Sequence, residues 1–282
     1  MKRLKYILDR KSLEIIYKKS FVRPTLEYAD IVWDNCFEYE KDDLQKIQNE
    51  AARIVTGCTK LVSISTLNKE VNWQSLQDRR NQHKLITFYK MTRSYAPEYL
   101  SSLIPPTVGS MSHYQSLRNA CNIQGIYSRT ANYANSFLPS TIQAWNQLPD
   151  EIKSCESINM FKSYFKRHVP KSNPLFYYGE RKYQVLHTQL RTMCSALNHH
   201  LYMKNIKNSP HCHCGAVEDN KHFFFECPTY NDARAVLLNT IANIATPTID
   251  IILSGDSSLN CAQNSIIFQA VHRFIKMTKR FS

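Results

Sequence analysis

Apolar side chains recur at steps of three and four residues along much of the chain, which is the spacing of one face of an α-helix. Between residues 39 and 55, Leu44, Ile47, Ala51 and Ile54 follow this spacing. Gly57 comes next, and glycine is the residue most suited to end a helix. The same spacing predicts further helices at residues 11–19, 139–146, 236–244 and 267–274, and another after residue 157. We therefore expect a mainly α-helical protein.

Two helices near the N-terminus are predicted from their first residues. Pro24 suits the first turn of a helix that runs toward Trp33. Asn72 is a candidate N-cap of a helix that carries Leu76 and Phe88 on its apolar face.

The most regular apolar stripe predicts one continuous helix, whose face is formed by Leu186, Leu190, Cys194, Leu197 and Leu201. By contrast, residues 105–135 contain Pro105, Pro106 and Gly109 and few periodic apolar positions, which predicts an extended connector. Residues 172–174 read as a second break. We expect three parts: a helical region at residues 1–104, a connector with helices at 105–174 and a helical C-terminal region at 175–282.

The chain is strongly basic. Lys and Arg number 36 against 23 Asp and Glu, so the formal net charge is +13. Residues 1–24 hold eight basic and two acidic side chains, and no acidic residue follows Asp256. Such a charge favours polyanionic partners, above all nucleic acid, because neutralising phosphates releases condensed counterions. A protein that is merely soluble and basic is the alternative.

Cysteine usage and hydropathy indicate a reducing compartment. The nine cysteines are an odd number and are scattered apart from one cluster. The first apolar run ends at Asp9, which argues against a secretory leader, and no apolar stretch approaches the ~20 residues of a membrane span. We expect an intracellular protein of nucleus or cytoplasm with no membrane partner.

The cysteine cluster has the pattern of metal ligands. Cys212 and Cys214 are followed by His222 and Cys227 within a short stretch. Three thiolates and one imidazole are the donor set of a closed, tetrahedral structural zinc site. Gly215 allows the sharp turn that would bring the first pair together, because glycine adopts positive φ without penalty. We expect one structural Zn²⁺, with unligated thiols as the alternative. The neighbouring His211 and His213 are expected to be bystanders, and the alternative for them is that one replaces a Cys as ligand.

Together with Pro228, Tyr230 and Arg234, the cluster resembles the C-terminal end of a non-LTR retrotransposon reverse transcriptase of the Jockey-like kind. Further residues resemble the thumb and connector of that family in order and spacing, over nearly the whole chain. They are Tyr17, Arg23, Pro24, Leu26, Glu27, Tyr28, Trp33, Leu44, Gln48, Arg53, Gly57, Leu76, Arg79, Arg80, Phe88, Leu117, Arg118, Asn119, Arg129, Phe137, Trp145, Asn146, Pro149, Phe161, Leu190, Arg191, Leu197 and Asn198.

The resemblance implies a helical thumb at residues 1–104 and a small zinc knuckle in the C-terminal part. In that family the polymerase uses a palm with paired aspartates. Tyr28-Ala29-Asp30 imitates the first three residues of that motif, but Ile31 stands where the second Asp would be, so we expect Asp30 to be a surface helical residue. Pro247-Thr248 with Asp250 and Asp256 does not match the restriction-like endonuclease pattern either. We therefore expect no enzymatic activity in this chain and no small-molecule substrate.

The expected function is binding of RNA or an RNA–DNA hybrid, with target DNA as a further candidate. The predicted phosphate-binding residues are Lys18, Lys19, Arg23, Arg79, Arg80, Lys166, Arg167 and Arg191. A solvated helix face is the alternative for each of these basic residues. Two other functions stay open at this point: the chain is part of a full RNA-directed DNA polymerase, or it is a domesticated, zinc-stabilised protein-interaction remnant.

Overall fold

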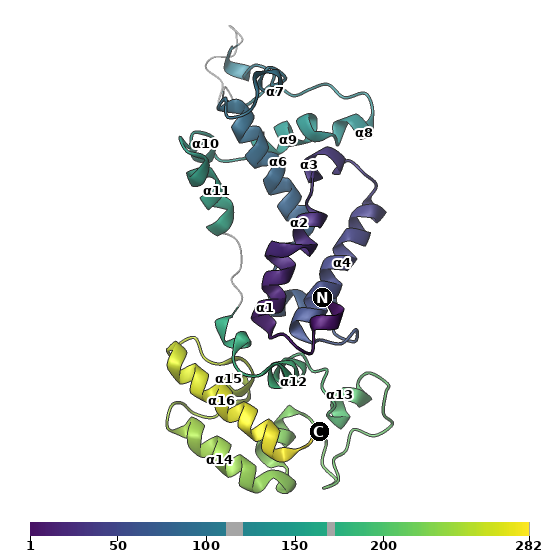
Figure 1. The fold of residues 1–282 in the computed structure, drawn as a ribbon, viewed down its shortest axis with the longest axis vertical. Helices are drawn as coiled ribbons and strands as arrows, with labels where there is room; N and C mark the ends of the chain where they lie inside the picture. The colour runs from purple at the N-terminus through teal and green to yellow at the C-terminus, as the bar shows by residue number, and fades with distance from the viewer. Residues whose placement is uncertain (111–120, 168–172, 282) are drawn as a thin grey trace. The chain divides into compact units, whose positions relative to one another are not determined.

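The computed structural model describes residues 1–110, 121–167 and 173–281 and is mainly α-helical, as expected (Figure 1). Within these ranges no residue lies in a β-strand, and the only β-pairing is two isolated antiparallel bridges, Thr107–Ile123 and His211–Val217. The part of the family-like pattern at Leu117, Arg118 and Asn119, and the expected break at residue 172, lie outside the described residues.

The chain divides into two compact units that interleave along the sequence. Unit 1 consists of residues 1–22, 49–72 and 171–282, and unit 2 of residues 23–48 and 73–170. The expected region 1–104 is thus distributed over both units, and the expected connector lies mostly in unit 2. The two predicted boundaries, after residues 104 and 174, stay a prediction.

The helices of unit 1 are, in chain order, η1 (Lys2–Leu4), α1 (Arg10–Ile15), η2 (Ile16–Ser20), α5 (Ile64–Val71), η4 (Pro174–Tyr177), α12 (Arg181–Arg191), α13 (Asn198–Tyr202), η5 (His222–Glu226), η6 (Pro228–Tyr230), α14 (Asn231–Ala242), α15 (Ile249–Ser254) and α16 (Cys261–Thr278). Those of unit 2 are α3 (Asp30–Trp33), α6 (Leu76–Thr92), α7 (Glu98–Ser101), η3 (Val108–Ser110), α8 (Ala131–Ala134), α9 (Phe137–Asn146), α10 (Asp150–Lys153) and α11 (Ile158–Arg167). The residues of α2 (Val22–Leu26) and α4 (Glu38–Thr56) are divided between the units.

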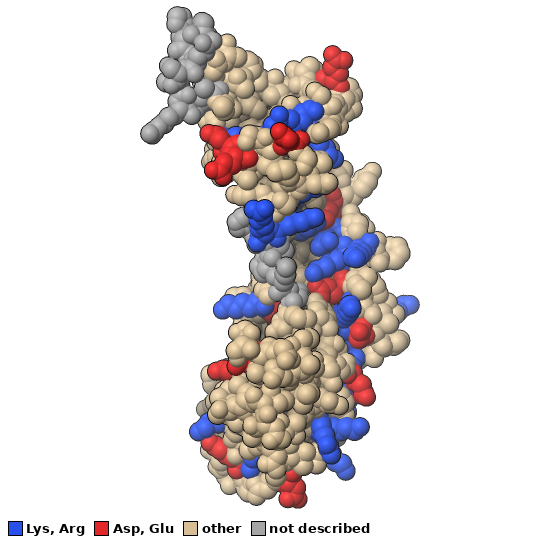
Figure 2. Space-filling view, turned by 90° about the vertical axis from the view of Figure 1, so that its left-hand side faces the viewer, with Lys and Arg blue, Asp and Glu red and all other residues tan. Residues whose placement is uncertain are grey.

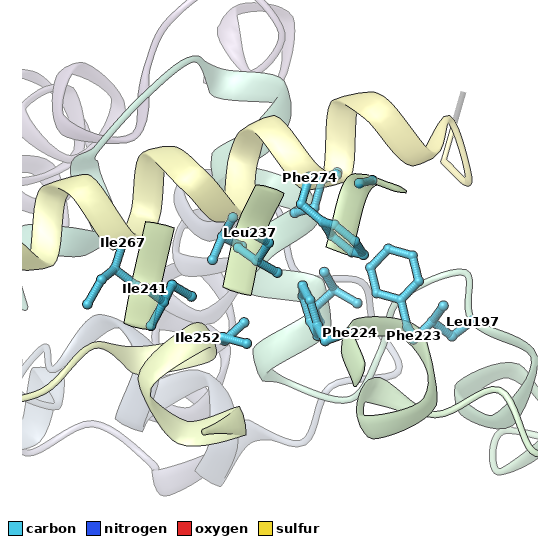
Figure 3. Packing of buried hydrophobic residues seen from close by; sticks show 12 residues of the cluster. Leu197, Phe223, Phe224, Leu237, Ile241, Ile252, Ile267 and Phe274 are labelled. Atoms are coloured by element: carbon cyan, nitrogen blue, oxygen red, sulfur yellow. The ribbon is translucent and has the colours of Figure 1, made fainter. Parts of the chain in front are cut away.

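The apolar core cluster of unit 1 is formed mainly by its C-terminal helices (Figure 3). Leu237 and Ile241 of α14 pack with Ile267 and Phe274 of α16, and Ile252 of α15 joins them. All of these side chains are fully or almost fully buried. The predicted apolar faces at residues 236–244 and 267–274 therefore build this core, except for Val236, which is 36% exposed.

A buried ion network joins the N-terminal and C-terminal segments of unit 1. The carboxylate of Glu70 on α5 accepts hydrogen bonds from Arg10 of α1 at 2.7 Å and from Arg191 of α12 at 2.6 and 2.9 Å. Arg191 also donates to the carbonyl oxygen of Leu253 at 2.8 Å and lies over the ring of Phe176, 3.7 Å from its centroid. Removing one partner of such a network is strongly destabilising, because it leaves an uncompensated buried charge. We therefore expect the network to hold these segments together.

The core of unit 2 is mainly aromatic. The rings of Tyr89 and Phe161 are stacked with centroids 4.5 Å apart, and Trp145 packs on both Phe88 and Phe161. Asn146, at the end of α9, holds the extended segment around Ile123. Its side chain accepts a hydrogen bond from the N–H of Ile123 at 2.9 Å and donates one to the carbonyl of the same residue at 2.8 Å. These paired hydrogen bonds hold an extended segment against a helix without a sheet.

The predicted end of the long helix at Gly57 is confirmed. Gly57 adopts φ +78°, and its N–H donates to the carbonyl of Arg53 at 2.8 Å. A Cβ at this position would lie 2.5 Å from a methyl group of Val185. Backbone conformation and close packing both require glycine here.

Two of the N-terminal predictions are wrong in detail. The helix predicted from Pro24 to Trp33 is two short helices, α2 and α3, because Ala29 adopts a left-handed conformation with φ 51° between them. Asn72 does not begin a helix; it ends α5 in the left-handed conformation, and Ser75 caps α6 by accepting from the N–H of Asp78.

The prediction of one continuous helix over the Leu186–Leu201 stripe is also wrong. α12 ends at Arg191 and α13 begins at Asn198. Met193 turns the chain with φ 56°, and the N–H of Cys194 bonds to the carbonyl of Gln189 at 2.9 Å. Leu190 and Leu197 are nevertheless both fully buried, so the stripe marks the core although the helix is interrupted.

Among the described residues, no helix combines the length and apolar character that crossing a bilayer would require.

We predict that Gly57→Ala destabilises the protein by about 1–3 kcal/mol, because it adds both a strained φ and a steric overlap with Val185. The free energy of unfolding in urea measures this. The matched control is Gly125→Ala, because Gly125 has no positive φ and nothing lies within 4 Å of an added Cβ. Equal stability of the two variants would contradict the packing described for α4.

We predict a pH-dependent role for Glu70. Burial acts to raise the pKa of Glu70, but Arg191 and Arg10 outweigh it, and the pKa lies below its ordinary value. A carboxyl with a lowered folded pKa contributes stability above the unfolded pKa of about 4.3, and this contribution is lost as the pH falls through the folded pKa. Glu70→Gln should therefore cost about 3 kcal/mol at pH 7, and the difference from wild type should shrink below about pH 4.

Urea unfolding across the pH range checks this, with exposed Glu98→Gln as the control. A Glu70→Gln difference that stays constant down to pH 3 would rule out the ion network as its source.

Candidate metal centre

The first ligand pair lies on a short hairpin-like turn. The N–H of Cys212 donates to the carbonyl of Ala216 at 2.8 Å, and the N–H of Glu218 donates to the carbonyl of Pro210 at 2.9 Å. Gly215 adopts φ +88° at the tip, as predicted, and a Cβ there would meet nothing within 4 Å. Backbone conformation alone therefore favours glycine at this turn, which carries Cys212 and Cys214 on one side.

The second pair flanks the π-helical turn η5: His222 is its first residue, and Cys227 directly follows its last. The N–H of His222 donates to the side chain of Asp219 at 2.7 Å, and the N–H of Cys227 donates to the carbonyl of His222 at 2.8 Å. Phe223 and Phe224 follow His222 directly and are fully buried in the core of unit 1 (Figure 3). These two rings anchor the turn, so the ligands at its ends are held by the core.

The four side chains converge. One ligand atom from each of Cys212, Cys214, His222 and Cys227 lies within 4.8 Å of all the others. The sulfurs of Cys212 and Cys227 are 3.8 Å apart, and the sulfur of Cys214 is 3.3 Å from Nε2 of His222. Two thiolates bound to one tetrahedral zinc at about 2.3 Å are themselves about 3.8 Å apart. This arrangement can hold a metal ion such as zinc.

Burial and hydrogen bonding act differently on two of the thiols. Burial raises the pKa of Cys212 to about 11, whereas a hydrogen bond with the backbone of Ala216 lowers the pKa of Cys214. Cys227 is fully buried. Metal ligation requires thiolates, so a cation at this position would compensate charges that the protein interior otherwise disfavours.

The imidazole is oriented for ligation through Nε2. Its Nδ1 is buried and has no hydrogen-bond partner among the described residues, and the nearest acidic oxygen, on Glu226, is 4.0 Å away. His211 and His213 are not part of the convergent group. The side chain of His211 lies 3.1 Å from the hydroxyl of Ser209 instead.

Two charged side chains that the ligand spacing does not reveal tie the cluster to the rest of unit 1. Arg234 of α14 donates to the carbonyl oxygens of Phe224 and Cys227, and so closes the end of η5. Arg280 forms an ion pair with Glu218 at 2.7 and 2.8 Å, which joins the hairpin to the end of α16. Burial acts to raise the pKa of Glu218, but the hydrogen bonds from Arg280 and from the N–H of Asn198 outweigh it, and the pKa is lowered.

Several of the arginines predicted to bind phosphate are engaged inside the protein. Arg80 is 3% exposed and donates to Asp34 at 2.6 Å. Arg79 pairs with Glu27, and Arg191 belongs to the Glu70 network. Each guanidinium thus already has a carboxylate partner inside the fold.

The other predicted residues lie on the surface or near it. Lys19, Lys166 and Arg167 are exposed. Lys18 lies 2.5 Å from Glu14, and Arg23 lies 3.7 Å from Glu27. Lys18 and Lys19 belong to unit 1, and Arg23, Lys166 and Arg167 to unit 2.

The expectation for Asp30 is wrong in one respect: it is not a surface residue. Asp30 is 3% exposed, and its carboxylate lies 2.6 Å from Nδ1 of His83 on α6. This contact joins α3 to α6.

Comparisons of the chain with protein-family models, with curated proteins and with solved structures give no match.

Proposed function

We propose that this chain is a nucleic-acid-binding C-terminal fragment of a non-LTR retrotransposon reverse transcriptase, built from a thumb, a connector and a zinc knuckle. The observation that carries the proposal is the convergence of Cys212, Cys214, His222 and Cys227 within 4.8 Å. The resemblance to that family starts from the same four residues. The proposed partners are RNA or an RNA–DNA hybrid.

The proposed metal is one structural Zn²⁺ per chain. Four protein ligands complete the tetrahedral coordination of zinc, whereas catalytic zinc sites keep a position for water or substrate. The ligands also join two local turns to the core, through Phe223 and Phe224 on one side and the Glu218–Arg280 pair on the other. The role of the ion is therefore to close the knuckle.

The proposed nucleic-acid contacts rest on basic side chains that reach solvent. Figure 2 shows one face of the molecule, on which Lys and Arg side chains lie among Asp and Glu side chains. Contacts to a phosphate backbone would then be distributed over separate positions such as Lys19, Lys166 and Arg167. Distributed phosphate contacts favour binding with little sequence preference.

We predict that the purified protein contains one zinc per chain and that Cys227→Ser lowers the zinc content well below that value. Loss of a ligand leaves an incomplete coordination sphere, and the binding energy of a structural zinc is folding energy. Elemental analysis measures the metal. Hydrogen exchange measures the loss of protection, which is expected at residues 210–235.

The control is Cys261→Ser, because Cys261 is an exposed cysteine outside the ligand group. Full zinc occupancy in Cys227→Ser, or equal loss in both variants, would exclude the proposed ligand set.

We predict that affinity for an RNA–DNA hybrid falls steeply with salt, because basic side chains release condensed counterions from the duplex. Replacing Lys166 and Arg167 by Gln should flatten the slope of log K against log salt by about 2, at about 0.9 per phosphate contact. Fluorescence anisotropy over a salt series measures the slope.

The matched control is Lys41→Gln with Lys46→Gln in the same unit, where the lysines pair with Glu38 at 2.9 Å and with Asp43 at 2.8 Å. It removes the same charge and should leave the slope nearly unchanged. Binding that is insensitive to salt and selective for sequence would contradict the proposal.

A further inference from the structure

A small hollow lies between α12 and α16, which run close together in unit 1 (Figure 1). Its volume is about 250 Å³. Leu186 and the buried Ile275 give it apolar lining, and the aromatic side chains of Tyr183 and Phe281 also line it. Pockets that enclose a drug-sized ligand start at about 300 Å³, so this hollow has room for one ring or one phosphate group at a time.

Three lysines surround the hollow: Lys182, Lys276 and Lys279. All three are exposed, and none forms an ion pair with any residue that the structure describes. No acidic residue follows Asp256 in the sequence. Helix α16, which provides Lys276, therefore carries no acidic side chain that would compensate the charge of Lys276 or of Lys279 just after it. Lysine side chains in this state attract phosphate groups.

The aromatic side chains at the hollow are held in place from behind. The ring of Tyr183 lies 5.9 Å from that of His272, which is 8% exposed. The ring of Phe281 meets the buried ring of Phe223 edge-on, with centroids 5.5 Å apart. Both rings are half-buried, so each is supported by the core while part of it stays accessible. Supported aromatic rings are the platforms on which unpaired bases stack.

The knuckle supports one of the residues that line this hollow, Phe281, from behind. Phe223 follows the ligand His222 directly in sequence, and it supports Phe281. Arg280, the residue before Phe281, is paired with Glu218 on the ligand hairpin. The position of Phe281 therefore depends on the segment that the four metal ligands would close.

We propose that this hollow binds one nucleotide of a single-stranded nucleic acid, with the base stacked on Phe281 or Tyr183 and the flanking phosphates at Lys182, Lys276 and Lys279. The inference deepens the proposed function and rests on it, because it names the strand type and the residues that the C-terminal unit would use. Stacking accounts for base binding without a sequence preference, and the lysines account for a dependence on salt.

The probe is a single strand of about ten nucleotides with one 2-aminopurine, made both as RNA and as DNA. The fluorescence of 2-aminopurine is quenched when the base stacks. We expect quenching on binding to the 282-residue chain for at least one of the two backbones, and the ratio of the two affinities tells RNA from DNA. Phe281→Leu keeps apolar bulk but removes the π-face, so it should reduce the quenching and weaken binding about tenfold.

A triple variant tests the phosphate contacts. Lys182→Gln, Lys276→Gln and Lys279→Gln together should flatten the slope of log K against log salt by about 2, at about 0.7 per contact on a single strand. The matched control is Lys60→Gln, Lys69→Gln and Lys204→Gln, which removes three exposed lysines of the same unit that do not line the hollow. It should leave the slope and the quenching nearly unchanged.

The outcomes separate the two proposals. If the chain binds the single strand but the Phe281→Leu and triple-lysine variants bind it as wild type does, the hollow is not the site and the proposed function stands. If the wild-type chain binds neither strand nor hybrid at low salt, the proposed function fails and the inference fails with it. Thermal unfolding of each variant checks that a loss of binding does not come from a loss of fold. If Phe281→Leu does not fold, Phe281→Tyr replaces it, because tyrosine keeps the aromatic ring. Retained quenching of 2-aminopurine by Phe281→Tyr supports the site, and loss of quenching in this variant overturns the site.

Discussion

The C-terminal part of this protein depends on one electrostatic constraint: three thiols and an imidazole share a space in which their ligand atoms lie within 4.8 Å of one another. Two of the thiols, Cys212 and Cys227, are buried. Deprotonating thiols this close together and this poorly solvated is unfavourable, and a bound divalent cation would offset that cost. An ion held there would turn two local turns, each too short to be stable alone, into one closed knuckle.

The constraint extends beyond the ligands because their neighbours are core residues. Phe223 and Phe224 leave the π-helical turn directly into the core between α14 and α16, and Arg234 binds the carbonyls at the end of that turn. On the hairpin side, Glu218 joins the ligand segment to Arg280. Local closure at the knuckle and the position of the C-terminal segment are therefore coupled through packing and one ion pair.

Basic side chains in this protein fall into two groups that the composition does not distinguish: those that neutralise buried carboxylates and those that are exposed to solvent. Arg10, Arg80 and Arg191 are buried or nearly so and neutralise Asp34 or Glu70 inside the fold. They stabilise the structure, and only the exposed remainder is available to a polyanion. The proposed binding function thus depends mainly on lysines and on a few surface arginines such as Arg167, which contribute long-range attraction and salt dependence more than sequence recognition.

Local sequence patterns predicted the α-helical class, the helix end at Gly57 and the four converging ligands, because each of these depends on residues close together in the chain. The interruption at Met193 was missed because the apolar stripe of Leu190 and Leu197 continues across it. The left-handed turns at Ala29 and Asn72 occur at residues other than glycine, so composition gives little warning of them. The burial of Arg80 and Asp30 depends on partners more than forty positions away, Asp34 and His83, which no local pattern can supply.

The most direct test of this account is X-ray absorption spectroscopy at the zinc edge on the purified 282-residue chain. The account predicts a first coordination shell of three sulfurs at about 2.3 Å and one nitrogen at about 2.0–2.1 Å, with no water ligand. A shell made only of oxygen and nitrogen, or a protein purified in the presence of zinc that holds none, would contradict it.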